Sequence, residues 1–243
     1  MINGLRAAIV GALILASCGA ADPAARIDTR DKAAIEAIVR DYILAHPEII
    51  PEAINGMQSR DVARLLKSNR AEIETPFPGA IAGNPRGDVA LVEFFDYACP
   101  YCRAAHADIV KLVAADPRLR IVYRDFPVLS EASGEAALAA LSAAKQGKYA
   151  AFHDRMFDTA GKVDHERTVA IVRAAGLSET RTASDLTSAA LKTEIKKNLD
   201  LGRALGITGT PTFVVGDRIL SGAVGYQALA DAVATARKAG AAG

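Results

Sequence analysis

The chain has 243 residues, of which 51% are hydrophobic and 23% are charged. This length and apolar content allow a sizeable core and exclude a wholly disordered protein, which would combine low hydrophobicity with high net charge. The formal net charge is only +1, so nothing favours a nucleic-acid-binding protein. Three cysteines are too few for a disulfide-stapled miniprotein, and their odd number means that at least one does not pair within the chain.

Residues 1–18 are typical of an export signal. Arg6 precedes an apolar run over residues 7–16, which is shorter than the roughly 20 residues that span a bilayer as a helix. The run ends in Leu-Ala-Ser-Cys at Cys18, which resembles the lipobox of bacterial lipoproteins. That resemblance implies that Cys18 is lipidated and holds a domain outside the cytosol at a membrane surface. The alternative is an ordinary signal peptide, with Cys18 discarded or left free.

The sequence predicts a tether over residues 19–30 and a helical segment over residues 31–75. Apolar residues recur at spacings of three and four from Ile35 to Ile43, which is typical of one helix face. Pro47 should interrupt this pattern, because the residue before a proline avoids the helical region. The apolar stripe must be buried on the following domain or against a second chain, and we favour the second chain.

From residue 76 onward, the sequence predicts alternating strands and helices. Prolines and glycines between residues 76 and 85 indicate a domain boundary. An apolar run at 89–95 predicts a buried strand, a helix should follow to residue 113, and residues 119–123 predict a second strand. The alanine-rich stretch 131–205 predicts helices with breaks near residues 147, 161 and 176. A hairpin at 213–220 and a helix at 226–238 should close the domain.

Cys99 and Cys102 form a CxxC motif at the first junction of this βαβ unit. A structural zinc site needs four ligands, and although His106 could join the cysteines, no fourth ligand is identifiable. A cysteine pair between a buried strand and a helix is instead the context of a redox motif. The helix N-terminus favours the thiolate form of Cys99, the attacking sulfur, and Cys102 lies one turn on to resolve a mixed disulfide. We therefore expect no metal and no cofactor beyond this redox-active pair.

Two motifs resemble those of the DsbA-type thiol:disulfide oxidoreductases, a thioredoxin-fold family. Residues 93–102 (EFFDYACPYC) look like the family's active-site strand and helix, and residues 208–214 (TGTPTFV) look like its cis-proline loop. Residues 226–229 resemble the start of its last helix. The resemblance implies an α/β thioredoxin fold over residues 76–243, with a large helical insertion at about 131–205, preceded by the N-terminal helical segment.

The resemblance also implies roles for single residues. Pro211 would be the cis-proline facing the cysteine pair, and Thr210 would offer backbone groups to a substrate strand. Glu93 takes the place of the family's buried acid, a proton acceptor for the buried cysteine, and burial should raise its pKa. The alternative for Glu93 is a solvated residue at a sheet edge. Pro100 suits the first helical turn, because its missing N–H costs nothing there.

The direction of electron flow rests on finer features. Tyr101 stands where the strongly oxidising members of the family carry a histidine, and Thr210 is similar to the residue before the cis-proline of the disulfide isomerases. Residues 42–53 resemble the N-terminal oligomerisation helices of the ScsC (suppressor of copper sensitivity) subfamily. This implies a homo-oligomer, a dimer or trimer, that presents several redox sites to one substrate.

We therefore expect a disulfide isomerase or reductase of the bacterial periplasm, anchored through Cys18 and acting on unfolded or misoxidised secreted proteins. A membrane redox partner would reset Cys99 and Cys102. One alternative is a DsbA-like oxidase that introduces disulfides. Another is a copper-binding or copper-tolerance protein that holds Cu(I) through the same thiols, since soft thiolates suit this soft ion.

Overall fold

The computed structural model describes residues 29–241. The chain divides into two compact units, Met1–Ala53 and Ile54–Gly243. The predicted export signal with Cys18 and most of the predicted tether lie outside the described residues. Among residues 29–241, none of the helices combines the length and the apolar content of a membrane span.

In the first unit, the described residues form α1 (Thr29–Ala45) and the start of α2 (Ile49–Glu74). The break at Pro47 is where the sequence predicts it, and the amide of His46 makes the last backbone hydrogen bond of α1, to Tyr42 at 2.8 Å. The apolar stripe of α1 is solvent-exposed in the single chain, with Ile38 68% and Tyr42 55% accessible. Among residues 29–53, nothing covers this face of α1.

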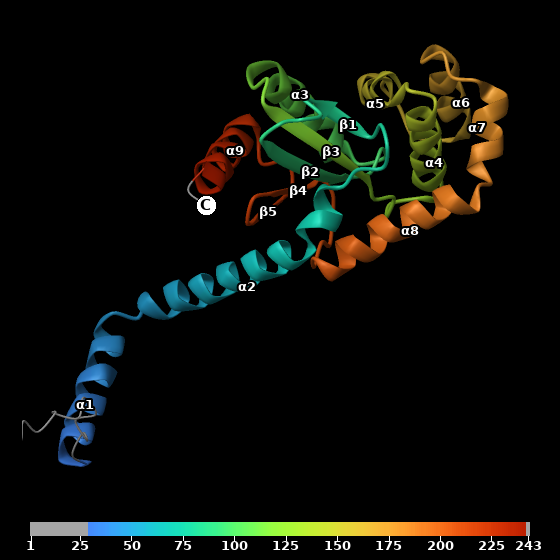
Figure 1. Cartoon of the computed structure of the whole chain (residues 1–243). Helices are drawn as coiled ribbons and strands as arrows, with labels where there is room; N and C mark the ends of the chain where they lie inside the picture. Colours follow the sequence, from blue (N-terminus) through green and yellow to red (C-terminus); the bar gives the residue numbers. More distant parts are fainter. Residues whose placement is uncertain (1–28, 242–243) are drawn as a thin grey trace, which may run out of the picture. The chain divides into compact units, whose positions relative to one another are not determined.

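The second unit is built on a five-stranded sheet in the order β1-β3-β2-β4-β5 (Figure 1). β2 and β3 are parallel and are connected by α3 (Pro100–Ala115), which makes a βαβ unit. The other neighbouring strands are antiparallel. The α/β fold expected from the sequence is thus confirmed. The strands are β1 (Ile81–Gly83), β2 (Val89–Phe95), β3 (Leu119–Asp125), β4 (Thr212–Val215) and β5 (Arg218–Ser221).

Five helices between β3 and β4 form the predicted insertion, which lies beside the sheet and returns to β4 through α8 (Figure 1). The predicted breaks near residues 147, 161 and 176 are present. A further break was missed, where the Ser188 side chain accepts from the amide of Leu191 and starts α8. The helices of this unit after α2 are α3 (Pro100–Ala115), α4 (Glu131–Lys145), α5 (Tyr149–Asp158), α6 (His165–Ala174), α7 (Glu179–Leu186), α8 (Ala189–Ala204) and α9 (Tyr226–Ala241).

The sheet is covered on both faces, because alternate residues of β2 and β3 point to opposite sides. One face, including Leu91 and Phe95, packs under α3, α9 and the insertion. The other face, including Phe94, packs against α8 and against Leu66 and Ile73 of α2. The end of α2 is therefore part of the second unit's core.

The structural division at residues 53 and 54 differs from the domain boundary predicted at residues 75 and 76. The buried Arg124 of β3 explains why the last turn of α2 stays with the sheet. Its guanidinium donates to the carbonyls of Glu72, Ile73 (3.2 Å) and Thr75 (2.5 Å), which satisfies the open C-terminus of α2. Helical periodicity alone could not separate this half of α2 from the preceding half.

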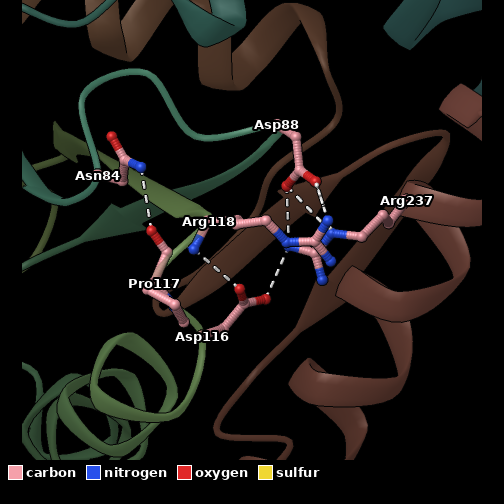
Figure 2. Close-up of polar contacts among 6 residues, drawn as sticks. All are labelled: Asn84, Asp88, Asp116, Pro117, Arg118 and Arg237. Atoms are coloured by element: carbon pink, nitrogen blue, oxygen red, sulfur yellow. Dashed lines mark hydrogen bonds and ion pairs between the residues drawn. The ribbon is translucent and has the colours of Figure 1, made fainter.

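Polar contacts close the end of the sheet at the start of β2 (Figure 2). Arg237 of α9 donates through Nε to both carboxylate oxygens of Asp88, at 3.0 and 2.9 Å, and through Nη2 to Asp116 at 2.7 Å. Asp116 caps the C-terminus of α3, and the Asn84 amide donates to the Pro117 carbonyl at 3.0 Å. These contacts join α9, α3 and the start of β2 at one end of the sheet. The cysteine pair lies at the opposite end of the sheet, where β2 is followed by α3.

Candidate active site

Cys99 lies at the junction of β2 and α3, as the sequence predicts. It is the N-cap residue of α3, with an extended backbone (φ −80°, ψ 118°), and Pro100 is the first helical residue. Cys102 follows within the first turn and is fully buried, whereas Cys99 keeps 4% of its surface accessible. Both cysteines are thiols in this structure. The Cys99 sulfur thus lies at the start of α3, where the first backbone N–H groups have no partner within the helix.

The loop before β4 completes the site from a distant part of the chain. The Thr210–Pro211 peptide bond is cis, as expected, and the Cys99 thiol donates to the carbonyl oxygen of Thr210 at 3.2 Å. The loop is held by its own contacts, because the Thr212 hydroxyl donates to Gly209 at 2.8 Å. Cys99 and Pro211 therefore belong to one site.

Glu93 lies in the middle of β2 with a side chain that is only 1% exposed. Its strand neighbours are Tyr123 and Phe213. Among the described residues, neither carboxylate oxygen has a hydrogen-bond partner. Burial raises the pKa of Glu93 to about 8, and negative charge on Cys99 adds to this effect. The alternative of a solvated Glu93 at a sheet edge is excluded.

Cys102 shares this apolar environment. Burial raises the pKa of its thiol well above the usual range, and the nearby Glu93 carboxylate raises it further. An ionised Glu93 therefore disfavours the thiolate form of Cys102. Glu93 can accept the proton that leaves Cys102 only when its own carboxyl group is ionised.

Tyr101 is the residue of the motif that faces solvent, with 66% of its surface exposed. The four-residue motif thus divides into a buried cysteine pair and an exposed aromatic side chain. Because tyrosine stands here, no imidazole lies between the two cysteines.

Two buried contacts beside the motif were missed by sequence reasoning. The Asp96 carboxylate accepts three backbone N–H groups, from Ala98, Val128 and Leu129. The Tyr97 hydroxyl lies 3.0 Å from Nδ1 of His153, whose pKa is lowered by burial. The hydrogen bond between the Asp96 carboxylate and the Ala98 amide is a local turn contact of a kind that a sequence can indicate. The contacts with Val128, Leu129 and His153 join distant parts of the chain, and no local sequence pattern predicts them.

His106, the one residue considered as a further metal ligand, contacts side chains of α5. Its Nε2 lies 3.6 Å from the Asp154 carboxylate. Within residues 29–241, no three histidine, cysteine or acidic side chains are grouped as a metal site would require.

Two family models match the chain. The DSBA-like thioredoxin domain matches residues 90–234, which include the cysteine pair and the cis-proline loop. The N-terminal domain of the copper resistance protein ScsC matches residues 31–64, which include most of α1 and the first half of α2.

Solved structures show the same similarity. A thioredoxin-like oxidoreductase from Silicibacter pomeroyi is 46% identical, over 65% of this chain and 91% of that one, with a TM-score of 0.64. A linker-deletion mutant of ScsC from Proteus mirabilis is 29% identical, over 89% of this chain and 99% of that one, with a TM-score of 0.68.

Among curated proteins, the Na(+)/H(+) antiporter NhaA 1 of Salinispora arenicola is 27% identical over 158 residues, which are 64% of this chain and 24% of the antiporter. The chain spans about a quarter of the length of the first curated relatives that it matches. The similarity thus concerns a domain that also occurs joined to other sequences. The domain model covers more than half of this chain and includes its cysteine pair. The chain belongs to the DsbA-like thioredoxin family.

Proposed function

We propose that the protein is a thiol:disulfide oxidoreductase that acts on protein disulfides through Cys99 and Cys102. The observation that carries this proposal is the contact of the Cys99 sulfur with the Thr210 carbonyl, 3.2 Å away across the cis-proline loop. The thiol at the N-terminus of α3 thus lies beside backbone groups that can bind an extended substrate. Glu93 lies beneath the pair as a proton acceptor.

The reaction begins when the Cys99 thiolate attacks one sulfur of a substrate disulfide. A bond forms between Cys99 Sγ and that sulfur, the substrate S–S bond breaks, and the other substrate sulfur leaves as a thiolate. If another substrate thiolate then displaces Cys99, the substrate disulfide has been rearranged without net electron transfer. If Cys102 attacks Cys99 Sγ instead, its proton passes to Glu93, the pair becomes a disulfide, and the substrate leaves with two more electrons.

We favour the isomerase or reductase direction over the oxidase direction. Tyr101 places no imidazole next to the Cys99 sulfur, so the thiolate has less stabilisation than a neighbouring histidine would give it. A less stabilised thiolate makes the disulfide form of the pair less oxidising. Thr210 before the cis-proline supports the same direction.

The exposed face of α1 supports an assembly of identical chains. Ile38 and Tyr42 are each more than half exposed, and a folded chain seldom leaves such an apolar stripe uncovered. Because this stripe lies within the match to the ScsC N-terminal domain, we propose a second copy of this chain as its partner. A dimer or trimer would raise the local concentration of redox sites around one trapped substrate.

The cellular setting follows from the same proposal. Unfolded or misoxidised secreted proteins are the substrates, the periplasm is the compartment, and a membrane redox partner returns the pair to its working state. Lipidation at Cys18 would keep the protein at the membrane. Replacement of Cys18 by Ser, followed by membrane fractionation, tests this point, and an unchanged membrane fraction would contradict the anchor.

The direction of electron flow is tested by refolding a substrate protein with scrambled disulfides. We expect the reduced protein to restore the activity of the substrate. No reactivation, together with rapid oxidation of reduced substrate, would show an oxidase instead. The chain contains no tryptophan, so its own redox state is followed by thiol alkylation and mass, from which the reduction potential is obtained.

Copper binding through the same thiols is a second candidate, favoured by the match of residues 31–64 to a domain named for copper resistance. Cys99 and Cys102 are soft ligands of the kind that Cu(I) prefers. Metal analysis of the reduced protein and of Cys99→Ser separates the candidates. Stoichiometric copper that disappears in the variant would support a copper carrier.

A further inference from the structure

Glu93 is buried, yet it has to exchange a proton with solvent in every turnover. Burial raises its pKa to about 8, so most molecules hold this carboxyl group protonated at neutral pH and must ionise it before it can accept the Cys102 proton. Cys102 has no exposed surface, and Cys99 keeps only 4%. A substrate chain bound to Cys99 covers this side of the site further. Ionisation of Glu93 in the mixed disulfide therefore calls for another route to solvent.

Tyr123 is the ionisable neighbour of Glu93 within the sheet. The two residues are paired across β2 and β3, so their side chains lie next to each other on the same face. Tyr123 is only 4% exposed. Burial raises the pKa of Tyr123 well above its usual range, and the charges of Glu93 and then of Asp154 raise it further. Tyr123 therefore lies close enough to both acids to interact with their charges.

His153 of α5 packs on Tyr123. The centroids of the two rings lie 4.1 Å apart, and His153 is 1% exposed. Its Nδ1 lies 3.0 Å from the Tyr97 hydroxyl, whereas its Nε2 has no hydrogen-bond partner in the described part of the chain. A tyrosine hydroxyl can donate or accept, so it can keep its bond to Nδ1 in either tautomer of the imidazole. Nε2 is therefore free to accept a proton or to donate one.

His106 of α3 extends this series of side chains toward the surface. Its ring centroid lies 5.3 Å from that of His153, and its Nδ1 is likewise buried without a partner among residues 29–241. Its Nε2 lies 3.6 Å from the carboxylate of Asp154, whose side chain is 52% exposed. His106 and Asp154 line a cavity of about 920 Å³ between α3 and α5. Ionisable groups thus extend from the buried Glu93 to a solvent-accessible carboxylate.

Packing alone does not account for the two histidines. A phenylalanine in place of His153 or His106 would fill the aromatic cluster without burying an imidazole nitrogen that lacks a partner. Each such nitrogen lowers the free energy of unfolding, as does the unpartnered carboxyl group of Glu93. Ionisable groups that are buried at this cost between an acid and a cavity indicate a function in proton transfer.

We propose that Tyr123, His153 and His106 carry the proton of Glu93 to the cavity between α3 and α5. The inference rests on the thiol:disulfide oxidoreductase function proposed above, and it assigns proton transfer to three residues outside the CxxC motif. The route leaves the site on the side away from the substrate, so Glu93 can ionise while the mixed disulfide is in place.

The transfer moves one proton and no electrons. The Glu93 carboxyl group gives its proton to the Tyr123 oxygen as the hydroxyl proton of Tyr123 moves to Nε2 of His153. Nε2 passes the proton to Nδ1 of His106, and the protonated His106, which the charge of Asp154 stabilises, releases a proton to water in the cavity. Side-chain rotations bring each donor to its acceptor. Glu93 is left ionised and can accept the next proton from the cysteine pair.

The test is a single turnover by the full-length protein with a disulfide peptide that contains tryptophan. The chain has no tryptophan, so the fluorescence of the peptide reports its reduction. The main variant is Tyr123→Phe, which removes one hydroxyl group and keeps the ring, and His153→Phe interrupts the next step. The matched control is Tyr149→Phe, because Tyr149 is similarly buried and its ring lies 5.4 Å from that of His153.

In the parent protein, Glu93 should ionise faster than Cys102 attacks, so the peptide is released in one phase. We expect two phases in Tyr123→Phe and in His153→Phe. Molecules in which Glu93 is already ionised should react at the parent rate, and the others about tenfold more slowly, because loss of the proton limits them. The fraction in the fast phase should grow as the pH rises through about 8. Tyr149→Phe should keep the single phase.

A single phase in Tyr123→Phe at every pH would overturn the route, even if the rate itself changed, because altered packing shifts a rate without dividing it. Two phases in Tyr149→Phe would also overturn it. Tyr123→Phe keeps the test valid if His153→Phe does not fold, since it removes one oxygen atom from an unchanged ring. Failure of the parent protein to reduce the peptide would instead refute the oxidoreductase function itself.

Discussion

Two carboxyl groups on the same stretch of chain have opposite surroundings. Asp88, just before β2, is paired with Arg237, which holds its pKa below the usual range. Glu93, five residues later in β2, is buried without a hydrogen-bond partner among the described residues, and its pKa is raised to about 8. The paired carboxylate stabilises one end of the sheet, whereas the unpaired one costs stability and can accept a proton at the other end.

The largest expected effect comes from removing the nucleophile at the Glu93 end. Cys99→Ser should lower the exchange rate by roughly a thousandfold or more, because serine is not ionised at neutral pH. Cys102→Ser should instead accumulate a mixed disulfide between Cys99 and the substrate. Non-reducing electrophoresis measures both results. A mixed disulfide trapped through residue 102 in Cys99→Ser would reverse the assigned roles.

Replacement of Glu93 by Gln should lower the activity and raise the stability of the protein. The step in which Cys102 attacks should become about a hundredfold slower, and its rate should lose the rise with pH toward about 8 that follows ionisation of Glu93. Stopped-flow reduction of substrate at several pH values measures this. A variant that keeps the full rate and the full pH dependence would exclude Glu93 as the acceptor.

The same substitution should raise the free energy of unfolding by about 3 kcal/mol at pH 7. The pKa of Glu93 is raised on folding, so the folded state binds the extra proton and loses stability as the pH rises from 4.5 toward 8. Glutamine has no such penalty. The gain should therefore vanish below pH 4.5, and urea denaturation at both pH values measures it.

The two halves of the N-terminal helical region should respond differently to truncation. Leu66→Ala, within the core beneath the sheet, should lower the free energy of unfolding by about 3 kcal/mol, because it leaves a cavity. Ile38→Ser, on the exposed face of α1, should leave the unfolding of the catalytic unit unchanged but lower the particle mass. Denaturation and light scattering measure these effects, and a monomeric parent protein would contradict the proposed assembly.

The smallest effect is expected at the Asp88 end. Arg237→Gln should lower the Tm by only a few degrees, and less at high salt, because this guanidinium and its partners are partly exposed to solvent. The exchange rate should not change. A large loss of activity in this variant would show that the two ends of the sheet are coupled.

The candidate active site could be predicted because its signals are local. The spacing of Cys99 and Cys102, the apolar run before them and the sequence around Pro211 each lie within a few residues. β1 was missed because its three residues stand among prolines and glycines, and only pairing with β3 makes them a strand. Asp96 binds amides that are 32 and 33 residues away along the chain, and no local sequence pattern predicts these contacts.

The boundary in α2 shows a different limit. Leu66 and Ile73 continue the helical pattern that begins before Pro47, so periodicity treats all these residues as one segment. What separates them is the surface against which they pack, and this depends on Phe94 and Val122 of the sheet. The helical segment predicted over residues 31–75 therefore includes the C-terminal half of α2, which packs in the core of the second unit.

The small exposed surface of Cys99 has a consequence for oxidative damage. Successive peroxide molecules convert a reactive thiolate to sulfenic and then to sulfinic acid, and the second step is irreversible in most proteins. With 4% of Cys99 exposed and Cys102 buried one helical turn away, a sulfenic acid on Cys99 meets a thiol of its own chain before it meets another oxidant. The product is the ordinary disulfide of the pair, so the arrangement that serves exchange should also protect the sulfur from permanent loss.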